Sequence, residues 1–118
     1  MNLTELSDKL NELKKDKVFY GMINQELEEW DYIVYYRTNS SDNVTSFTRE
    51  FQVAVVEENN IQENYDEVVI NKVLELSGVR VVGDVEFEYT RKPNTDTVIE
   101  VMLITFAYAN KKGGKCGS

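Results

Sequence analysis

The sequence contains no histidine, one cysteine and one proline, and its 21 acidic residues outnumber its 13 lysine and arginine residues. Histidine is the only side chain that changes charge near neutral pH without perturbation, so nucleophilic catalysis by a histidine base is excluded. Zinc sites built from cysteine and histidine clusters are excluded as well. The single cysteine, Cys116, lies among glycines and cannot form an internal disulfide. We therefore expect no enzymatic activity, no metal and no cofactor.

Long hydrophobic runs are also missing, since none approaches the roughly 20 residues that cross a bilayer. Residues 1–8 carry acids where a secretory signal has bases. We expect synthesis in a cytoplasm and no membrane partner. The net charge of −8 disfavours ordinary binding to DNA phosphates, because such binding needs clustered lysine and arginine.

Acidic residues concentrate in two stretches that contain no base, residues 26–31 and 57–67. Such runs are usually a solvated surface that keeps a protein soluble. The alternative is a surface that repels DNA or mimics it. Composition leaves both interpretations open.

Apolar residues at helical spacing predict an amphipathic helix at the N-terminus, beginning at Leu3 and reaching Leu13. Residues 18–21 are expected to be extended, and residues 22–30 fit a helix or a loop. Residues 32–37 and 47–56 predict paired strands, since they are rich in β-branched and aromatic side chains. The polar residues 38–46 between them predict an exposed loop, which is either a projecting contact arm or a floppy turn.

A second helix is predicted from Ile61 to about Ser77, and Gly78 suits the position that follows a helix end. Its apolar stripe is expected to lie in the core.

Residues 81–91 and 97–108 predict a hairpin, with a turn at residues 92–96 that contains the only proline. The expected register places Tyr89 opposite Ile99 and Glu88 beside Glu100. Toward the end of the last strand, the face that contains Glu100 is apolar too. This second apolar face predicts either a contact between subunits or cover by the N-terminal helix, and the helix is favoured.

These elements predict an α+β fold in the order α-β-β-α-β-β. The sheet is expected to be mostly antiparallel, with about four to five strands and one or two helices on one face. At 118 residues, the chain is expected to form a single domain over residues 1–110, followed by a flexible C-terminal tail at residues 111–118.

Four segments in this order carry a resemblance to a known family: residues 31–37 (DYIVYYR), 51–57 (FQVAVVE), 74–78 (LELSG) and 99–106 (IEVMLITF). Over roughly residues 18–110 the chain resembles the tail-terminator, or tail-completion, proteins of long-tailed bacteriophages. The resemblance implies a structural virion protein, made in the host bacterial cytoplasm, that ends tail-tube growth and joins the tail to the head. It also implies a ring at the tail–head junction, generally a hexamer, through which DNA passes.

The implied partners are further copies of the chain, the tail-tube protein and the head connector protein, with DNA passing through unbound. A bore that DNA crosses should repel phosphates. The candidates for an acidic lumen are Glu57, Glu58, Glu63, Asp66, Glu67, Asp84, Glu86, Glu88 and Glu100. The candidates for docking loops are Thr38, Asn39, Asp42, Asn43, Lys92, Asn94 and Asp96.

Two other functions remain open. An acidic inhibitor could mimic DNA and block a DNA-binding enzyme, in which case its carboxylates should be spaced along one face like phosphates. The chain could also be a generic protein-binding adaptor.

Overall fold

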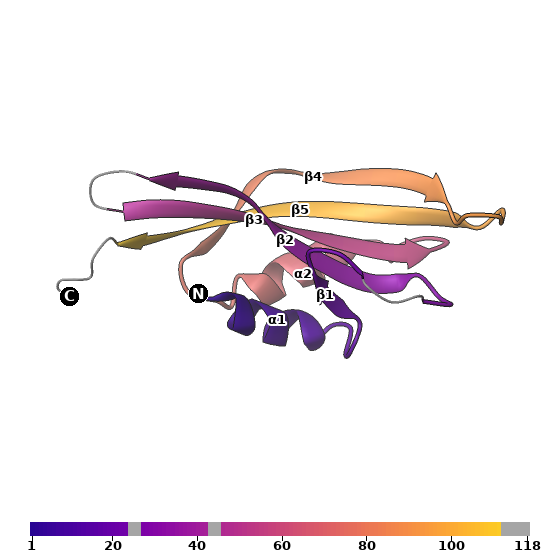
Figure 1. Ribbon diagram of the computed structural model, residues 1–118, viewed down its shortest axis with the longest axis horizontal. Coiled ribbons are helices and arrows are strands. Elements are labelled where there is room, and N and C mark those ends of the chain that lie inside the picture. Colours follow the sequence, from indigo (N-terminus) through magenta and orange to yellow (C-terminus); the bar gives the residue numbers. More distant parts are fainter. Residues whose placement is uncertain (24–26, 43–45, 112–118) are drawn as a thin grey trace.

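The computed structural model describes residues 1–23, 27–42 and 46–111, which form two helices and a five-stranded sheet (Figure 1). The elements are α1 (Leu3–Asn11), β1 (Val18–Tyr20), β2 (Asp31–Asp42), β3 (Ser46–Glu58), α2 (Tyr65–Val73), β4 (Val79–Arg91) and β5 (Val98–Lys111). The strand order is β1-β2-β3-β5-β4, with β1 parallel to β2 and the other neighbouring pairs antiparallel. The predicted α+β fold is confirmed, and β1 adds one strand to the predicted order.

Both helices pack against the same face of the sheet, which we call the covered face (Figure 1). Leu6 and Leu10 of α1 are fully buried in one core with Val69 and Val73 of α2. The same core contains Met102, Ile104 and Phe106, so the expectation that the N-terminal helix covers the apolar face that contains Glu100 is confirmed. Packing α1 beside α2 buries the apolar stripes of both helices in a single core.

The helical spacing overestimates the length of the second helix. α2 ends at Val73 rather than near Ser77. Leu76 is buried in the turn that follows, so its spacing reflects contact with the core and not a further helical turn. Gly78 has a φ of 80°, which glycine adopts readily, and it leads directly into β4. Neither described helix is long and apolar enough to cross a membrane.

Most of the polar segment 38–46 is not a loop. β2 continues to Asp42 and pairs there with β3, so the prediction of a loop that begins at Thr38 is wrong. Backbone hydrogen bonds continue the pairing through residues 38–42, which include no apolar side chain, and this polar composition concealed the strand. In Figure 1 the strand ends 38–42, 46–50 and 107–111 extend past both helices, and we call them the arm.

The register of the β4–β5 hairpin differs by one residue from the predicted register. Tyr89 lies opposite Glu100, and Glu88 lies opposite Val101, so the predicted pairing of Glu88 with Glu100 is wrong. A shift of one residue exchanges the two faces of a strand. The β5 residues on the covered face are Glu100, Met102, Ile104, Phe106 and Tyr108. Because β5 is apolar on both faces, alternation alone did not define its register.

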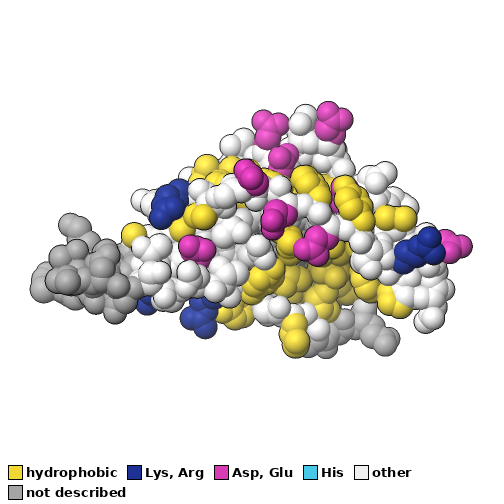
Figure 2. All heavy atoms as spheres, turned by 90° about the horizontal axis from the view of Figure 1, so that it is seen from above, with side chains coloured by type: hydrophobic (Ala, Val, Ile, Leu, Met, Phe, Trp, Pro, Cys, Tyr) yellow, Lys and Arg dark blue, Asp and Glu magenta, His cyan; other side chains and the backbone are white. Residues whose placement is uncertain are grey.

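The opposite face of the sheet carries no helix from the part of the chain that the structure describes, and we call it the open face. At one end, a small cluster covers part of it: Tyr32, Val56 and Ile99 with Ile23, Leu27 and Trp30. Figure 2 shows apolar side chains gathered on this side of the molecule, with acidic side chains beside them. The described part of residues 22–30 contains no helix, and residues 24–26 lie outside it.

The molecule is elongated, measuring 56 × 27 × 22 Å along its principal axes. The turn between β4 and β5 confirms the predicted turn at residues 92–96 and is closed by a 2.9 Å hydrogen bond from Lys92 N to Thr97 O. We call residues 92–97 the tip. The arm and the tip lie at opposite ends of the long axis (Figure 1).

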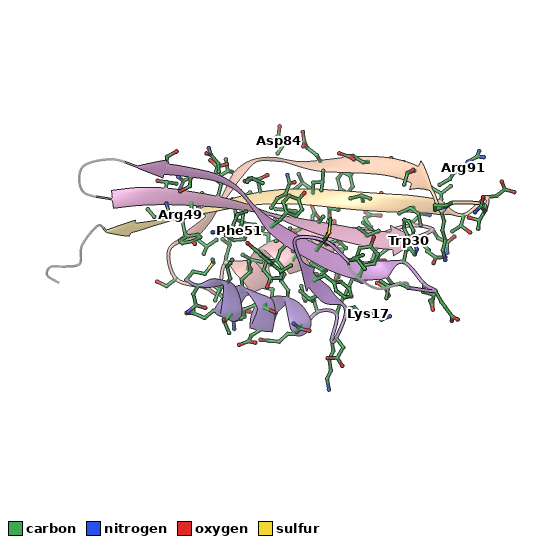
Figure 3. All side chains as sticks on the ribbon, viewed as in Figure 1. Lys17, Trp30, Arg49, Phe51, Asp84 and Arg91 are labelled. Atoms are coloured by element: carbon green, nitrogen blue, oxygen red, sulfur yellow. The ribbon has the colours of Figure 1, made fainter. Side chains whose placement is uncertain are left out.

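Replacing Phe51 by alanine should lower the free energy of unfolding by about 3–5 kcal/mol. Phe51 is 1% exposed and stacks on Phe106 with ring centres 5.3 Å apart, below the sheet in Figure 3. Phe87→Ala is the matched control and should cost about 1 kcal/mol, because nearly half of the Phe87 side chain already contacts water. Urea unfolding measures both values, and equal losses would contradict this description of the core.

Candidate partner-binding surfaces

The acids predicted to line a lumen fall into two groups. Three of them make contacts within the fold: Glu57, Glu58 and Glu100. The others are exposed or half-buried: Glu63, Asp66, Glu67, Asp84, Glu86 and Glu88. Glu57 and Glu58 are already paired with lysines, whereas Glu100 accepts hydrogen bonds from neutral donors only.

Lys14 neutralises part of the first group at one end of the core. Its Nζ lies 2.9 Å from Glu57 Oε2 and also contacts the carboxylate of Asp31. The ammonium lies 5.3 Å from the centre of the Tyr65 ring, within reach of a cation–π interaction. The Lys14 side chain is only 10% exposed. Burial opposes its charge, but the hydrogen bonds to Asp31 and Glu57 outweigh burial and raise its pKa.

Glu100 continues this line of carboxylates across the sheet, since it lies opposite Glu57. The residue is 8% exposed. Its Oε1 accepts a 2.6 Å hydrogen bond from Ile61 N, and its Oε2 accepts a 2.7 Å hydrogen bond from the Tyr89 hydroxyl. The bond to Glu100 raises the pKa of the Tyr89 hydroxyl. Within residues 1–23, 27–42 and 46–111, no lysine or arginine forms an ion pair with Glu100.

A groove of about 350 Å³ opens beside Glu100, between β4 and the start of α2. Three acids and no base line it, and the full lining is Ile61, Gln62, Glu63, Asn64, Asp66, Phe87, Tyr89, Glu100 and Met102. Phe87 and Tyr89 are large, exposed side chains of this lining. The combination of apolar walls with negative charge suits a cation that is carried on an apolar stem.

The exposed acids of β4 lie on the outermost strand of the sheet. Figure 3 shows Asp84 pointing away from the body of the molecule. The strand register places Glu86 and Glu88 on the open face. Glu63 and Glu67 lie near the start of α2, on the covered side. The exposed acids therefore flank the β4 edge on both sides and do not form one row.

Lys92 anchors the tip to the end of β3. Its Nζ donates a 2.8 Å hydrogen bond to Glu58 Oε2, which also accepts a 2.7 Å bond from Trp30 N. These two bonds lower the pKa of Glu58. Asn94 and Asp96 are exposed beyond this anchor. Of the docking candidates at the tip, these two can meet a partner, whereas Lys92 positions them.

The docking candidates of the arm belong mainly to a strand. Thr38 and Asn39 are exposed positions of β2, and Asp42 ends that strand. Asn43 lies outside the described residues. The arm therefore offers a partner the backbone edge of β2 together with short polar side chains.

The described residues contain no group of three or more acidic or cysteine side chains that could hold a metal ion. The sequence matches no protein-family model, and no curated protein is significantly similar to it. The resemblance to tail-terminator proteins therefore stays a prediction.

Sequence reasoning did not single out Lys14. In the sequence Lys14 is one of two adjacent lysines, and nothing local distinguishes it from Lys15. Its partners become visible only when β2 pairs with β3 and brings Asp31 beside Glu57. The hydrogen bond from Ile61 N to Glu100 joins residues far apart in the sequence in the same way.

Replacing Lys14 by methionine should lower the free energy of unfolding by about 1–3 kcal/mol at neutral pH, because two carboxylates at the end of the core lose their cation. The exposed neighbour supplies a matched control, Lys15→Met, which should change stability by less than about 0.5 kcal/mol. Urea unfolding of the two variants compares the losses. Equal losses would show that the Lys14 contacts do not stabilise the fold.

The pH dependence of this difference follows from the raised pKa of Lys14. A lysine whose pKa is higher in the folded state contributes fully below its unfolded value of about 10.4, and its contribution disappears as the pH rises through the folded value. The stability gap between the wild type and Lys14→Met should be constant up to about pH 9 and shrink above about pH 10.5. A stability difference that stays constant above about pH 10.5 would contradict the conclusion that the charged form of Lys14 stabilises the fold.

Proposed function

We propose that this protein is a structural subunit of a ring at the head-proximal end of a bacteriophage tail. The ring ends tail-tube growth and joins the tail to the head. The proposal starts from the resemblance of residues 18–110 to tail-terminator proteins, and the lack of histidine agrees with a protein that performs no chemistry. Its partners are copies of itself, the tail-tube protein and the head connector protein.

The observation that supports this function most is the placement of the two candidate docking segments. The arm and the tip lie at opposite ends of a molecule that is 56 Å long (Figure 1). A subunit that joins two different assemblies needs separate contacts at opposite ends. Long strands connect those ends through continuous ladders of backbone hydrogen bonds, so a load applied to the arm is carried directly to the tip.

The distribution of charge fits the passage of DNA. The candidate acids that form no hydrogen bond or ion pair with other described residues flank β4, and they repel phosphates at close range. DNA mimicry receives less support, because a mimic needs carboxylates in a row on one face. Three of the candidate acids, Glu57, Glu58 and Glu100, are occupied by contacts within the fold.

Tail tubes assembled from the tail-tube protein of the same phage provide the test of this function. The protein should stop tube elongation and appear as a ring at one tube end in electron micrographs. Replacing residues 93–96 by two glycines should leave the fold and the ring intact and remove one contact, either to the tube or to the head connector. Tubes that keep growing in the presence of the wild-type protein would contradict the proposal.

The acids of the open face can be tested through DNA ejection. The variant Glu86→Lys/Glu88→Lys should still assemble into rings, because both side chains lie on the open face and outside the groove. It should reduce DNA ejection, because lysines in a bore hold phosphates. Glu5→Lys/Asp8→Lys changes the charge by the same amount at exposed sites of α1 and serves as the control. Infectivity and the fraction of DNA released from purified virions measure the effect. Normal ejection by the first variant would remove these two acids from the bore.

A further inference from the structure

The sheet has two free edges of unlike length and chemistry. β4 forms one edge along its whole length. On the other side, β1 pairs with β2 only from Ile33 to Tyr35, and residues 36–42 of that edge have no strand partner among the described residues. Free edges expose backbone donors and acceptors that pair readily with another strand.

The β4 edge is acidic from Asp84 to Glu88, and the bases Arg80 and Arg91 lie on either side of this stretch. Asp84, Glu86 and Glu88 lie on the strand itself, and the acidic groove lies beside it. Inside the groove, Glu100 accepts hydrogen bonds from two neutral donors and faces no base in its lining. A nearly buried carboxylate with only neutral partners gains a strong, charge-assisted hydrogen bond when a cation enters from outside.

The β2 edge carries an exposed base, Arg37. Arg37 lies opposite Phe51, a core residue, and therefore belongs to the covered face. Its Nε donates a 2.9 Å hydrogen bond to the Tyr20 hydroxyl, which holds the guanidinium at the sheet edge. Arg49 lies on the same face and donates to Ser40 Oγ at 2.5 Å, so this region of the arm has a second positive charge.

The strand directions allow these two edges to meet. β2 is antiparallel to β3, β3 to β5 and β5 to β4, so β4 runs opposite to β2. A second copy in the same orientation, placed beyond β4, therefore presents its β2 antiparallel to β4. The covered face then continues from one copy to the next, and Arg37 arrives on the same side as Phe87 and Tyr89. Arg37 is level with Phe51, Phe106 and Val81 across one sheet, whereas Tyr89 is level with Glu100, so the second copy is displaced toward the tip by about six residues of β5. The displacement also moves β1, which covers β2 only at residues 33–35, to the end of β4.

Other combinations of edges fit less well. Two β4 edges would place Asp84, Glu86 and Glu88 against the same acids of a second copy, and like charges on facing strands are unfavourable. Bulges interrupt both edges, between Val82 and Glu86 in β4 and next to Arg37 in β2. Regular pairing is therefore short, and the charges decide which edges associate.

We propose that copies of this chain associate head to tail, with the β2 edge of one copy paired to the β4 edge of the next and Arg37 seated in the acidic groove. Its aliphatic stem packs against Phe87 and Tyr89, and its guanidinium faces the groove carboxylates. The inference deepens the proposed ring and rests on that proposal for the closure of successive copies into a circle.

Exchanging the charges tests this contact. Arg37→Glu should weaken self-association at least about tenfold, and Glu63→Arg/Asp66→Arg should do the same, because each places like charges together. All three substitutions in one chain should restore association. Lys15→Glu changes the charge as Arg37→Glu does, at an exposed site outside both edges, and should behave as the wild type. Sedimentation velocity measures association, and thermal unfolding by circular dichroism verifies that each variant folds.

A cross-linking experiment reports the arrangement directly. In a chain with Cys116→Ser, the pair Thr38→Cys and Glu88→Cys places one thiol on each edge. A short bis-maleimide should then produce a ladder of multimers, in solution or on tail tubes. Either cysteine alone can give no more than dimers, which provides the control.

The outcomes separate this inference from the proposed function. If the Arg37→Glu protein forms rings that cap tubes normally, and the double-cysteine protein yields no ladder, the edge pairing is wrong. The proposed function is then unaffected. A ladder with charge rescue, from protein that fails to stop tube growth, supports the edge pairing and contradicts the function. Protein that stays monomeric both in solution and on tubes overturns the inference.

Discussion

The difference in length between helices and strands determines most of this structure. A helix of nine residues spans about 13 Å, whereas a strand of 13 residues spans about 43 Å. Two such helices side by side cover the middle of one face and nothing more. The arm, the open face and the free edges are the parts of the sheet that the helices do not reach. The surfaces available to partners are therefore a direct result of short helices on long strands.

The acidic composition has an internal role in addition to its surface role. Asp31, Glu57 and Glu100 are neighbours across three strands at one end of the core. Like charges on facing strands destabilise a sheet, and this line is compensated in two ways. Lys14 supplies a cation for the first two carboxylates, while Glu100 relies on a backbone amide and the Tyr89 hydroxyl. The second arrangement leaves Glu100 without a cation beside a groove that is lined by acids and no base.

Local patterns predicted the fold class, both helices and the four long strands, because apolar spacing reflects which side chains meet the core. The predictions were wrong where a residue is paired in a strand without being buried, or is buried without belonging to a helix. Thr38 continues a strand without an apolar neighbour, and Leu76 is buried without continuing a helix. The register of β5 depended on which of two apolar faces the helices cover. The contacts of Lys14 and Glu100 could not be predicted, because each joins residues that only the completed sheet brings together.

The strand order has a consequence for synthesis on the ribosome. β5 is the last strand to be translated, yet it lies between β3 and β4. Until it emerges, β3 lacks one neighbour and β4 has none, so nascent chains expose a long, apolar strand edge of the kind that aggregates. The complete sheet therefore forms only after β5 has been translated. Premature termination before β5 leaves a fragment without the centre of its sheet, and we expect chaperones and proteases to act on such fragments.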